Sequence, residues 1–196
     1  MKRAKKDGEN FNGLCMYSMD SIEGNQYFND MHWAFLYANK NRECIIKTVL
    51  SLLGLEYKNY KQDMINETHN HAEHIGNKRF LHRKGATPAE KGVMGIIPGN
   101  MRDGVFVTIG LGNEEWLNSA SHGAGRTMSR TKAKKVIDFQ KVLKELEELD
   151  ITVDITENNM DESPIAYKDV FKVIKAQEGI TVDIVDRFVP KIVHIG

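Results

Sequence analysis

Residues 92–113, GVMGIIPGNMRDGVFVTIGLGN, decide the fold class of this chain. Two short apolar runs, Val93–Ile97 and Val105–Ile109, stand on either side of a polar segment rich in Gly, Pro and Asn. Apolar runs punctuated in this way are typical of strands joined by tight loops. The stretch therefore predicts two neighbouring strands. The Pro98–Met101 turn between them either brings backbone close to a ligand or is an ordinary reverse turn.

Two longer segments have the spacing of helices. Between Gly24 and Leu55, apolar residues recur every three or four positions, which predicts one or two helices that end near Gly54. Residues 129–149, SRTKAKKVIDFQKVLKELEEL, predict one amphipathic helix. Its apolar stripe comprises Val136, Ile137, Phe139, Val142, Leu143, Leu146 and Leu149.

The other regular segments are short. Strands are predicted at Arg79–His82, in ITVDIT (151–156), in TVDIV (181–185) and in KIVHI (191–195), and Asp161–Gln177 predicts a loop followed by a helix. Strands and helices mix without regular alternation. The sequence therefore favours an α+β fold over a doubly wound sheet.

Bulk composition excludes several classes of protein. With 196 residues, 41% of them hydrophobic and 28% charged, the chain fits one soluble domain or one lobe of a larger one. No apolar run approaches the roughly 20 residues of a membrane span, and the start MKRAKKDGENF lacks the apolar stretch of a secretory signal. Cys15 and Cys44 cannot form a disulfide framework. We therefore expect a cytoplasmic protein with a frayed tail over residues 1–13.

The charges of the chain are balanced. Its 27 basic and 27 acidic residues cancel, so the chain as a whole lacks the basic character of a nucleic-acid-binding protein. Any affinity for RNA must come from local patches.

The segment NSASHGAGRTMSR, residues 118–130, is the most informative part of the sequence about function. His122 is followed by the small residues Gly123–Gly125, which let backbone N–H groups approach a ligand. The predicted helix adds unpaired N–H donors at its start, and Arg126 and Arg130 offer forks that match phosphate oxygens. We expect a phosphate here, with the imidazole of His122 donating to it or attacking it. The alternative is a tight turn in which His122 only caps neighbouring backbone.

A second candidate site is ETHNHAEH, residues 67–74, with histidines at 69, 71 and 74. In a strand His69 and His71 share a face, whereas in a helix His71 and His74 do. Imidazole nitrogen is a common ligand of zinc and manganese. Such a group of histidines also occurs as plain polar surface.

Two further segments are weaker signals. HRKGAT, residues 82–87, sets two cations beside a glycine, which fits a phosphate contact or a solvated turn. DESPIAYK, residues 161–168, offers Tyr167 for stacking or hydrogen bonding, and a buried core tyrosine is the alternative.

Taken in order, these segments resemble the successive motifs of the RtcB family of RNA ligases. The motifs are HNHAE, HRKGAT, IPGNM, SASHGAGR-x-MSR-x-KAK and DESP-x-AYKD, and the front segment SIEGNQYFNDMHWAFLYANKNR is similar to a helix of the family. The sequence PGNMRDG resembles the form of this motif in a smaller branch of the family. The resemblance covers residues 14–196. It implies the C-terminal, guanylate-binding lobe of an RtcB-type fold, with mixed sheets packed against helices.

The resemblance also implies an activity. Family members join an RNA 2′,3′-cyclic phosphate or 3′-phosphate end to a 5′-hydroxyl end, with GTP and Mn2+ as cofactors and RNA ends as substrates. By resemblance, His122 attacks the α-phosphate of GTP and carries the guanylate, and Arg126 steadies phosphate charge. His69 matches a metal ligand. The positions that match nucleotide-binding residues are His69, Asn70, Pro98, Gly99, Asn100, Met101, His122, Gly123, Ala124, Gly125 and Tyr167.

The chain departs from the family pattern in three places. The N-terminal half, with its Asp-x-x-Cys and His-Ser-Gly-Ser-Arg segments, is absent, so of the family's metal ligands only His69 has a counterpart, and one imidazole cannot hold manganese tightly. The usual final Lys-Gly is replaced by Ile195-Gly196. Val105 stands after the PGNM turn at a position that is commonly serine in the family. The last two changes remove polar contacts to the base, each worth on the order of 1 kcal/mol.

Three interpretations follow from these departures. The chain is a ligase part that works with a separate N-terminal half, a remnant or binding module that keeps an RNA or phosphate surface without catalysis, or a folded piece without function. The missing half also predicts an open face near His69 and the Pro98–Met101 turn, where exposed apolar side chains would favour dimerisation or partner binding.

Overall fold

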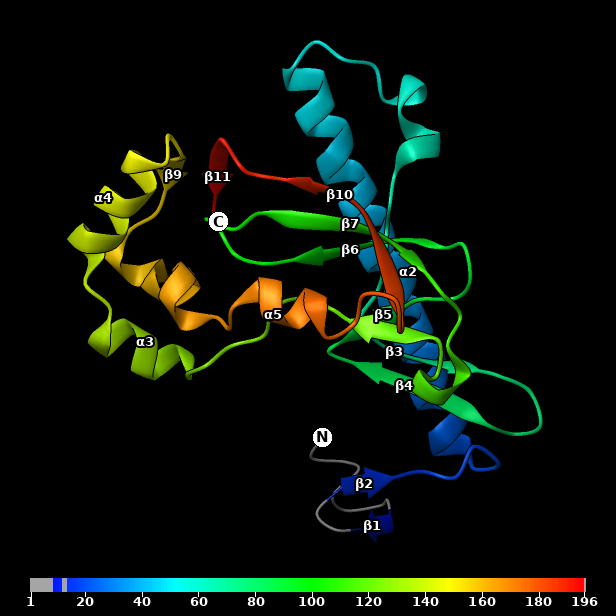
Figure 1. Cartoon of the computed structure of the whole chain (residues 1–196). Helices are drawn as coiled ribbons and strands as arrows, with labels where there is room; N and C mark the ends of the chain where they lie inside the picture. The colour runs from blue at the N-terminus through cyan, green and yellow to red at the C-terminus, as the bar shows by residue number, and fades with distance from the viewer. Residues whose placement is uncertain (1–8, 12–13, 196) are drawn as a thin grey trace. The chain divides into compact units, whose positions relative to one another are not determined.

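The computed structural model describes residues 9–11 and 14–195. The chain divides into two compact units, Met1–His82 (the first unit) and Arg83–Gly196 (the second unit), and each is described by itself. Helices and several small sheets confirm the α+β class (Figure 1). Among the described residues, no helix combines the length and apolarity that crossing a lipid bilayer requires.

The first unit is built around one long helix, α2 (Ile22–Leu52), and two small strand pairs. Strand β1 (Glu9–Phe11) pairs antiparallel with β2 (Leu14–Met16), and β3 (Asn70–His74) pairs with β4 (Phe80–Lys84), whose last two residues enter the second unit. The rest of the predicted tail, residues 1–8 and 12–13, lies outside the described residues. Two 3-10 turns, Tyr57–Asn59 and Lys61–Asp63, follow α2.

The single helix α2 confirms the prediction made for residues 24–55. The hydroxyl of Ser21 accepts from the N–H of Gly24 at 3.0 Å and caps its start. One face packs on the strand pair: the Phe28 ring lies 5.4 Å from that of Phe80, and the Met31 sulfur accepts from the Ala72 N–H at 3.2 Å.

The second unit contains an antiparallel sheet of three strands in the order β10-β7-β6. Strands β6 (Met94–Pro98) and β7 (Val105–Gly110) confirm the pair predicted from the opening stretch, and β10 (Val182–Phe188) lies on the other side of β7 with a bulge in its register. Residues of β7 alternate between half-buried and buried, so one face of the strand enters the core.

Two shorter strand pairs complete the strands of this unit. Strand β5 (Ala86–Pro88) is antiparallel to β8 (Ser119–Ser121), and β9 (Thr152–Asp154) is parallel to β11 (Ile192–His194). The 3-10 turn Glu114–Trp116 precedes β8. The pair β5–β8 brings HRKGAT next to the segment that carries His122.

The predicted helix over residues 129–149 is wrong in one respect, because the structure has two helices there. α3 (Arg130–Val136) ends at Ile137, whose φ/ψ of −88/127 are extended. Asp138 then caps α4 (Phe139–Glu148) by accepting from the N–H of Lys141 at 3.2 Å. The predicted loop and helix after Asp161 are present as 3-10 turns (Glu157–Glu162, Pro164–Ala166) and α5 (Val170–Lys175).

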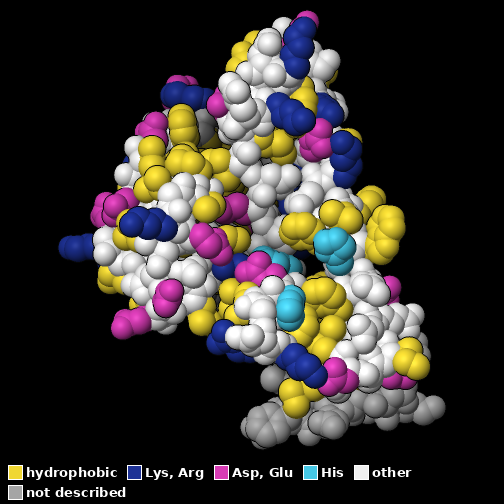
Figure 2. Space-filling model, turned by 90° about the vertical axis from the view of Figure 1, so that its right-hand side faces the viewer, with side chains coloured by type: hydrophobic (Ala, Val, Ile, Leu, Met, Phe, Trp, Pro, Cys, Tyr) yellow, Lys and Arg dark blue, Asp and Glu magenta, His cyan; other side chains and the backbone are white. Residues whose placement is uncertain are grey.

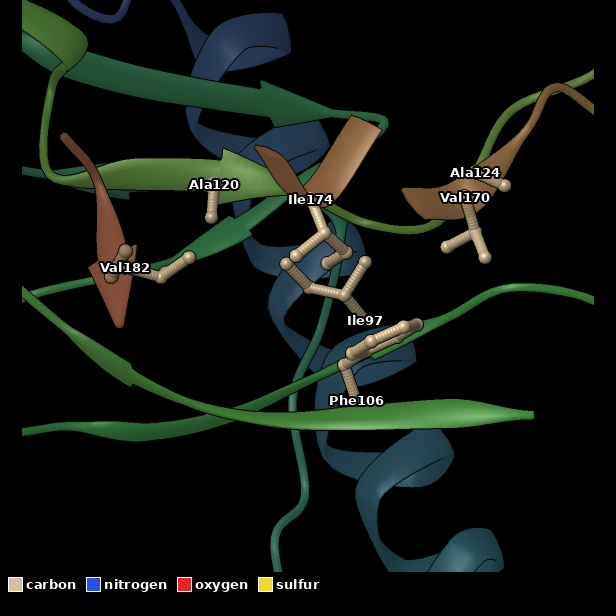
Figure 3. Close-up of a cluster of buried hydrophobic side chains, with 8 residues drawn as sticks. Ile97, Phe106, Ala120, Ala124, Val170, Ile174 and Val182 are labelled. Atoms are coloured by element: carbon tan, nitrogen blue, oxygen red, sulfur yellow. The ribbon is translucent and has the colours of Figure 1, made fainter. Parts of the chain in front are cut away.

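Two hydrophobic clusters hold the second unit together. The first packs residues of the three-stranded sheet, of β8 and of α5 against one another (Figure 3). The second packs α4 against the PGNM turn and the segments around β9. The first comprises Ala89, Ile97, Phe106, Ala120, Ala124, Val170, Ile174 and Val182, and the second Met101, Val142, Leu146, Ile151, Ile155 and Met160.

Candidate functional site

His122 lies directly after β8, at the start of the loop that leads to α3. Its backbone N–H donates to the carbonyl of Gly85 at 3.3 Å, in continuation of the β5–β8 pair. The hydroxyl of Ser121 donates to the carbonyl of Gly123 at 3.0 Å. Strand pairing therefore fixes where the small-residue loop begins.

Gly85 lies against the imidazole of His122. Its φ is +75°, and a Cβ there would come within 3.1 Å of Cδ2 and 3.3 Å of Nε2 of the ring. A side chain at this position would strain the backbone and push the ring. The glycine of HRKGAT thus allows the backbone to approach the imidazole of His122 closely.

The PGNM turn supports the other side of the loop. The N–H of Ala124 donates to the carbonyl of Pro98 at 3.0 Å, and a Cβ on Gly123 would lie 3.0 Å from the same oxygen. Ala124 itself is buried in the first hydrophobic cluster. Small residues are therefore required here because the loop and the turn approach closely.

The AYKD segment holds the end of the same loop. The N–H of Lys168 donates to the carbonyl of Gly125 at 2.9 Å, and the N–H of Thr127 donates to the carbonyl of Ala166, also at 2.9 Å. Four segments that the sequence singled out, HRKGAT, IPGNM, SHGAGR and AYKD, consequently meet around one loop of the second unit.

The guanidinium of Arg126 binds protein groups in this structure. It donates to the carbonyl of Asp161 at 2.5 Å and to that of Met128 at 3.2 Å, and lies 5.1 Å from the centre of the Tyr167 ring. The Tyr167 hydroxyl donates to Glu162, and burial together with this hydrogen bond raises the pKa of the phenol. The phosphate contact expected for Arg126 stays a prediction.

Arg130 is engaged in the same way. It pairs with Asp161 and Glu162, and although burial acts the other way, hydrogen bonds from Arg130 and Lys134 keep the pKa of Asp161 below its usual value. Residues 126–129 separate the small-residue loop from α3, which begins at Arg130 after its cap Ser129. The start of the predicted helix is therefore confirmed to within one residue, and the contribution of its N-terminus to anion binding stays a prediction.

An open cavity of about 360 Å³ lies beside Tyr167. Its walls carry two aromatic rings, two cations and two carboxylates. Arg102 stands at its edge, held by Asp103 at 2.8 Å and by Glu145 at 2.7 Å. Burial opposes ionisation of Asp103, yet hydrogen bonds from Arg102 and Asn100 hold its pKa below the ordinary value. The lining residues are Arg102, Asp103, Pro164, Ile165, Tyr167, Lys168, Asp169 and Phe171.

Arg83 is neither a phosphate contact nor part of a solvated turn. Its side chain is buried and donates to the Ser119 hydroxyl at 3.0 Å and to Glu90 at 2.8 Å. Arg83 is therefore a structural residue that binds β8 and the segment after β5 within the second unit.

The histidines of ETHNHAEH belong to the first unit. Asn70–His74 form strand β3, so the helical arrangement that would pair His71 with His74 is not present. His69 precedes the strand and is exposed, as is Asn70. His71 packs 6.0 Å from the Phe35 ring. Figure 2 shows histidine side chains reaching the surface next to hydrophobic ones.

The donor set for a metal is incomplete in this chain. Over residues 9–11 and 14–195, no three His, Cys, Asp or Glu side chains come together in a group that could hold a metal ion. His69 is the residue that matches a family ligand, and one imidazole does not provide the geometry of a manganese site. The residues described here therefore do not fit the metal by themselves.

Two further departures from the family pattern have a structural explanation. Val105 opens β7 opposite Pro98, and Ile195 packs against the second hydrophobic cluster. Neither side chain can hydrogen-bond a nucleobase.

Sequence reasoning did not assign two residues of this region. Gly85 was seen only as part of a basic segment, although a glycine between charged residues and a strand is a signal of close approach. Arg102 stood out by no local pattern, because its place beside the cavity depends on the distant Tyr167.

Comparison with known proteins gives one consistent result. Residues 1–196 match the family described as "tRNA-splicing ligase RtcB". The chain is 39% identical over 173 residues to "RNA-splicing ligase RtcB1" of Escherichia coli (strain ATCC 25922) and 38% identical to "RNA-splicing ligase RtcB" of strain K12; each match covers 81% of this chain and 42% of the relative. It is 32% identical to "tRNA-splicing ligase RtcB" of Methanopyrus kandleri, over 90% of this chain and 22% of that protein. The chain thus spans less than half the length of these relatives.

Proposed function

The chain belongs to the RtcB family, and from this membership we propose that it carries the guanylate during RNA ligation when the rest of an RtcB-type protein is present. A ring nitrogen of His122 attacks the α-phosphorus of GTP, so that a P–N bond forms, the P–O bond to the leaving group breaks, and pyrophosphate departs. The guanylate passes to an RNA 3′-phosphate, and a 5′-hydroxyl then displaces GMP to join the ends.

The observation that carries this proposal is the surroundings of His122. Gly85 lies against the Cδ2 and Nε2 edge of the ring, where a Cβ would be 3.1 and 3.3 Å from these atoms, so the glycine lets the imidazole keep its place at the start of the loop. The loop that follows is fixed at Ala124 by Pro98 and at Gly125 by Lys168. Fixed small residues next to a nucleophile favour close approach of a phosphate.

We infer that the cavity beside Tyr167 receives part of the nucleotide. The rings of Tyr167 and Phe171 suit the face of a nucleobase, and Arg102 and Lys168 suit its oxygens or the phosphates. Since the side chains of Val105 and Ile195 are apolar and cannot hydrogen-bond a base, we expect weak discrimination between GTP and ATP. Labelling with each nucleotide at equal concentration tests this expectation.

Manganese supplies charge neutralisation at phosphate oxygens when it is bound in a site of this kind. His69 is one ligand in this proposal, and the other ligands come from the remaining part of an RtcB-type protein. No catalytic step is assigned to the metal, because the donors of this chain do not complete its site.

A second candidate is a binding module without catalysis. It is favoured by the incomplete metal donor set of the described residues and by the 42% coverage of the relatives. Such a module would bind RNA ends or phosphate and would not be labelled by GTP under any condition.

The test is transfer of the α-phosphate label of GTP to the protein, with Mn2+, in the presence and absence of the remaining part of a relative. We expect labelling only when that part is present, and none for His122→Ala. The control is His194→Ala, an exposed histidine on β11 that pairs with Asp154. Equal labelling of His122→Ala and the unchanged chain would exclude the proposal. Absence of label with the complementary part, together with retained RNA binding, would favour the binding module.

A further inference from the structure

Helix α2 has two apolar sides. The side that carries Phe28, Met31 and Phe35 packs on the β3–β4 pair. At 100° per residue, the opposite side carries a second set of apolar residues. We call this set the outer face; it comprises Ile22, Trp33, Leu36, Tyr37 and Cys44.

The outer face is strongly exposed. Ile22 is 83%, Trp33 73% and Tyr37 73% exposed, and Gly24 is the only residue of α2 that is buried. A helix that is hydrophobic all round is normally buried on all sides. Trp and Tyr are also the residues that most often dominate the energy of protein interfaces. Exposed aromatic and aliphatic side chains gathered on one side of a helix indicate an interaction surface.

The lengths of the relatives indicate what covers this face. The chain matches 42% of each Escherichia coli protein, so more than half of each relative lies outside the matched part. We propose that the outer face of α2 is the surface on which that remaining part of an RtcB-type protein docks, whether joined in one polypeptide or supplied as another. The inference rests on the proposed function, because it takes the occupant from the same family.

Cys44 provides a natural probe of this docking. Residues 33, 37 and 44 follow one another at i+4 and i+7, so the thiol lies in line with the aromatic rings. It is exposed in the chain, whereas Cys15 is half-buried. Covering the outer face must therefore slow alkylation of Cys44.

The experiment is co-expression of the full 196-residue chain with the remaining part of a relative, followed by light scattering and alkylation with iodoacetamide. We expect a one-to-one complex in which Cys44 reacts at least about tenfold more slowly than in the chain alone. Trp33→Lys combined with Tyr37→Lys should abolish the complex, since lysine keeps helix propensity and removes the apolar contact. The matched control is Trp116→Lys, the same substitution at a tryptophan that is 59% exposed and lies on a 3-10 turn of the second unit.

Each other outcome overturns the inference. A dimer of the chain alone that Trp33→Lys dissociates would assign the face to a second copy. A complex that survives the double variant, with Cys44 still reactive, would place docking elsewhere. If the remaining part does not fold when co-expressed, the experiment is repeated with that part fused ahead of this chain in one polypeptide. Unchanged reactivity of Cys44 in the fusion would also contradict the inference.

Failure of the proposed function is distinguished by His122→Ala. This variant should form the complex with the same stoichiometry and the same Cys44 protection, although it cannot accept guanylate. Docking without labelling of the unchanged chain would leave the interface standing and remove the catalytic proposal. Labelling of the chain without protection of Cys44 would support the catalytic proposal and remove the proposed interface.

Discussion

The two units of this chain contrast in how their apolar residues are used. In the second unit, α4 buries Val142 and Leu146 completely, and the loops around His122 are tied by backbone hydrogen bonds. In the first unit, the 31 residues of α2 bury one glycine and leave Trp33 and Tyr37 exposed. The second unit therefore covers its apolar surface, as the hydrophobic effect favours, whereas the first unit leaves much of the apolar surface of α2 exposed.

The difference teaches which part of the function this chain supports by itself. The second unit carries its own core, so the surroundings of His122 are formed without help. The first unit carries His69, which we propose as one metal ligand, and a helix with exposed apolar side chains, so both of our proposals for this unit call on a further part of an RtcB-type protein. We therefore interpret the second unit as a self-supporting guanylate carrier and the first as a docking segment.

The largest expected effect concerns the core of the second unit. Leu146→Ala should lower the free energy of unfolding by about 2–5 kcal/mol, because the side chain is fully buried. Leu52→Ala, the same change at an 82% exposed position of α2, should change it by less than about 0.5 kcal/mol. Urea unfolding of both variants measures the difference. Similar losses would break the contrast between the units.

The next effect concerns the imidazole. Gly85→Ala should strain a backbone with φ of +75° and displace the His122 ring, and we expect guanylylation in the complemented protein to fall roughly tenfold. Gly54→Ala in the first unit has a φ of +71° with open space around it, so it should cost similar stability and retain labelling. Retained activity in Gly85→Ala would show that the close approach to the ring is unimportant.

A smaller effect on stability is expected to distinguish Tyr167 of the second unit from Tyr37 of the first. Tyr167→Phe removes a hydroxyl that donates to Glu162 and lies 3.4 Å from Arg126, and should cost about 1 kcal/mol of stability. Tyr37→Phe should have no measurable effect on the isolated chain, because its ring is exposed. Thermal unfolding of the two variants side by side tests whether the polar network of the second unit contributes to its stability.

The smallest effect is a dependence on pH. The pKa of Asp161 in the folded chain lies below its ordinary value of 3.8, so its ionised form adds stability above about pH 4 that is lost as pH falls through the lowered pKa. Asp161→Asn should flatten this acid-side loss in unfolding measurements. Hydrogen bonds from Lys40 and Lys47 lower the pKa of Glu43 to about 2, yet Glu43→Gln should leave the pH profile unchanged because exposed pairs contribute little. If Asp161→Asn and Glu43→Gln both flattened the dependence of stability on pH, the distinction between the buried and the exposed carboxylate would be contradicted.

Local sequence patterns predicted the strands and loops of the second unit well. The runs Val93–Ile97 and Val105–Ile109 are bounded by Gly, Pro and Asn, and both are strands in the structure. The apolar periodicity of residues 24–55 likewise gives one helix. These features depend on neighbouring residues alone, so they can be inferred from one sequence.

Other features depend on competition or on distant partners. The periodicity of residues 129–149 hid the break at Ile137, where the Asp138 side chain caps a new helix instead of continuing the old one. Arg83 was expected in a phosphate contact or a solvated turn, but strand alternation turns it inward toward Glu90 and Ser119. The position of Arg102 beside Tyr167 requires the folded chain.

The most direct test of the central claim is to map the site of guanylylation by mass spectrometry of peptides from the complemented protein after reaction with GTP. The proposal predicts one acid-labile GMP adduct, on the peptide that contains His122. An adduct on a lysine or on another histidine, with His122 unmodified, would contradict it.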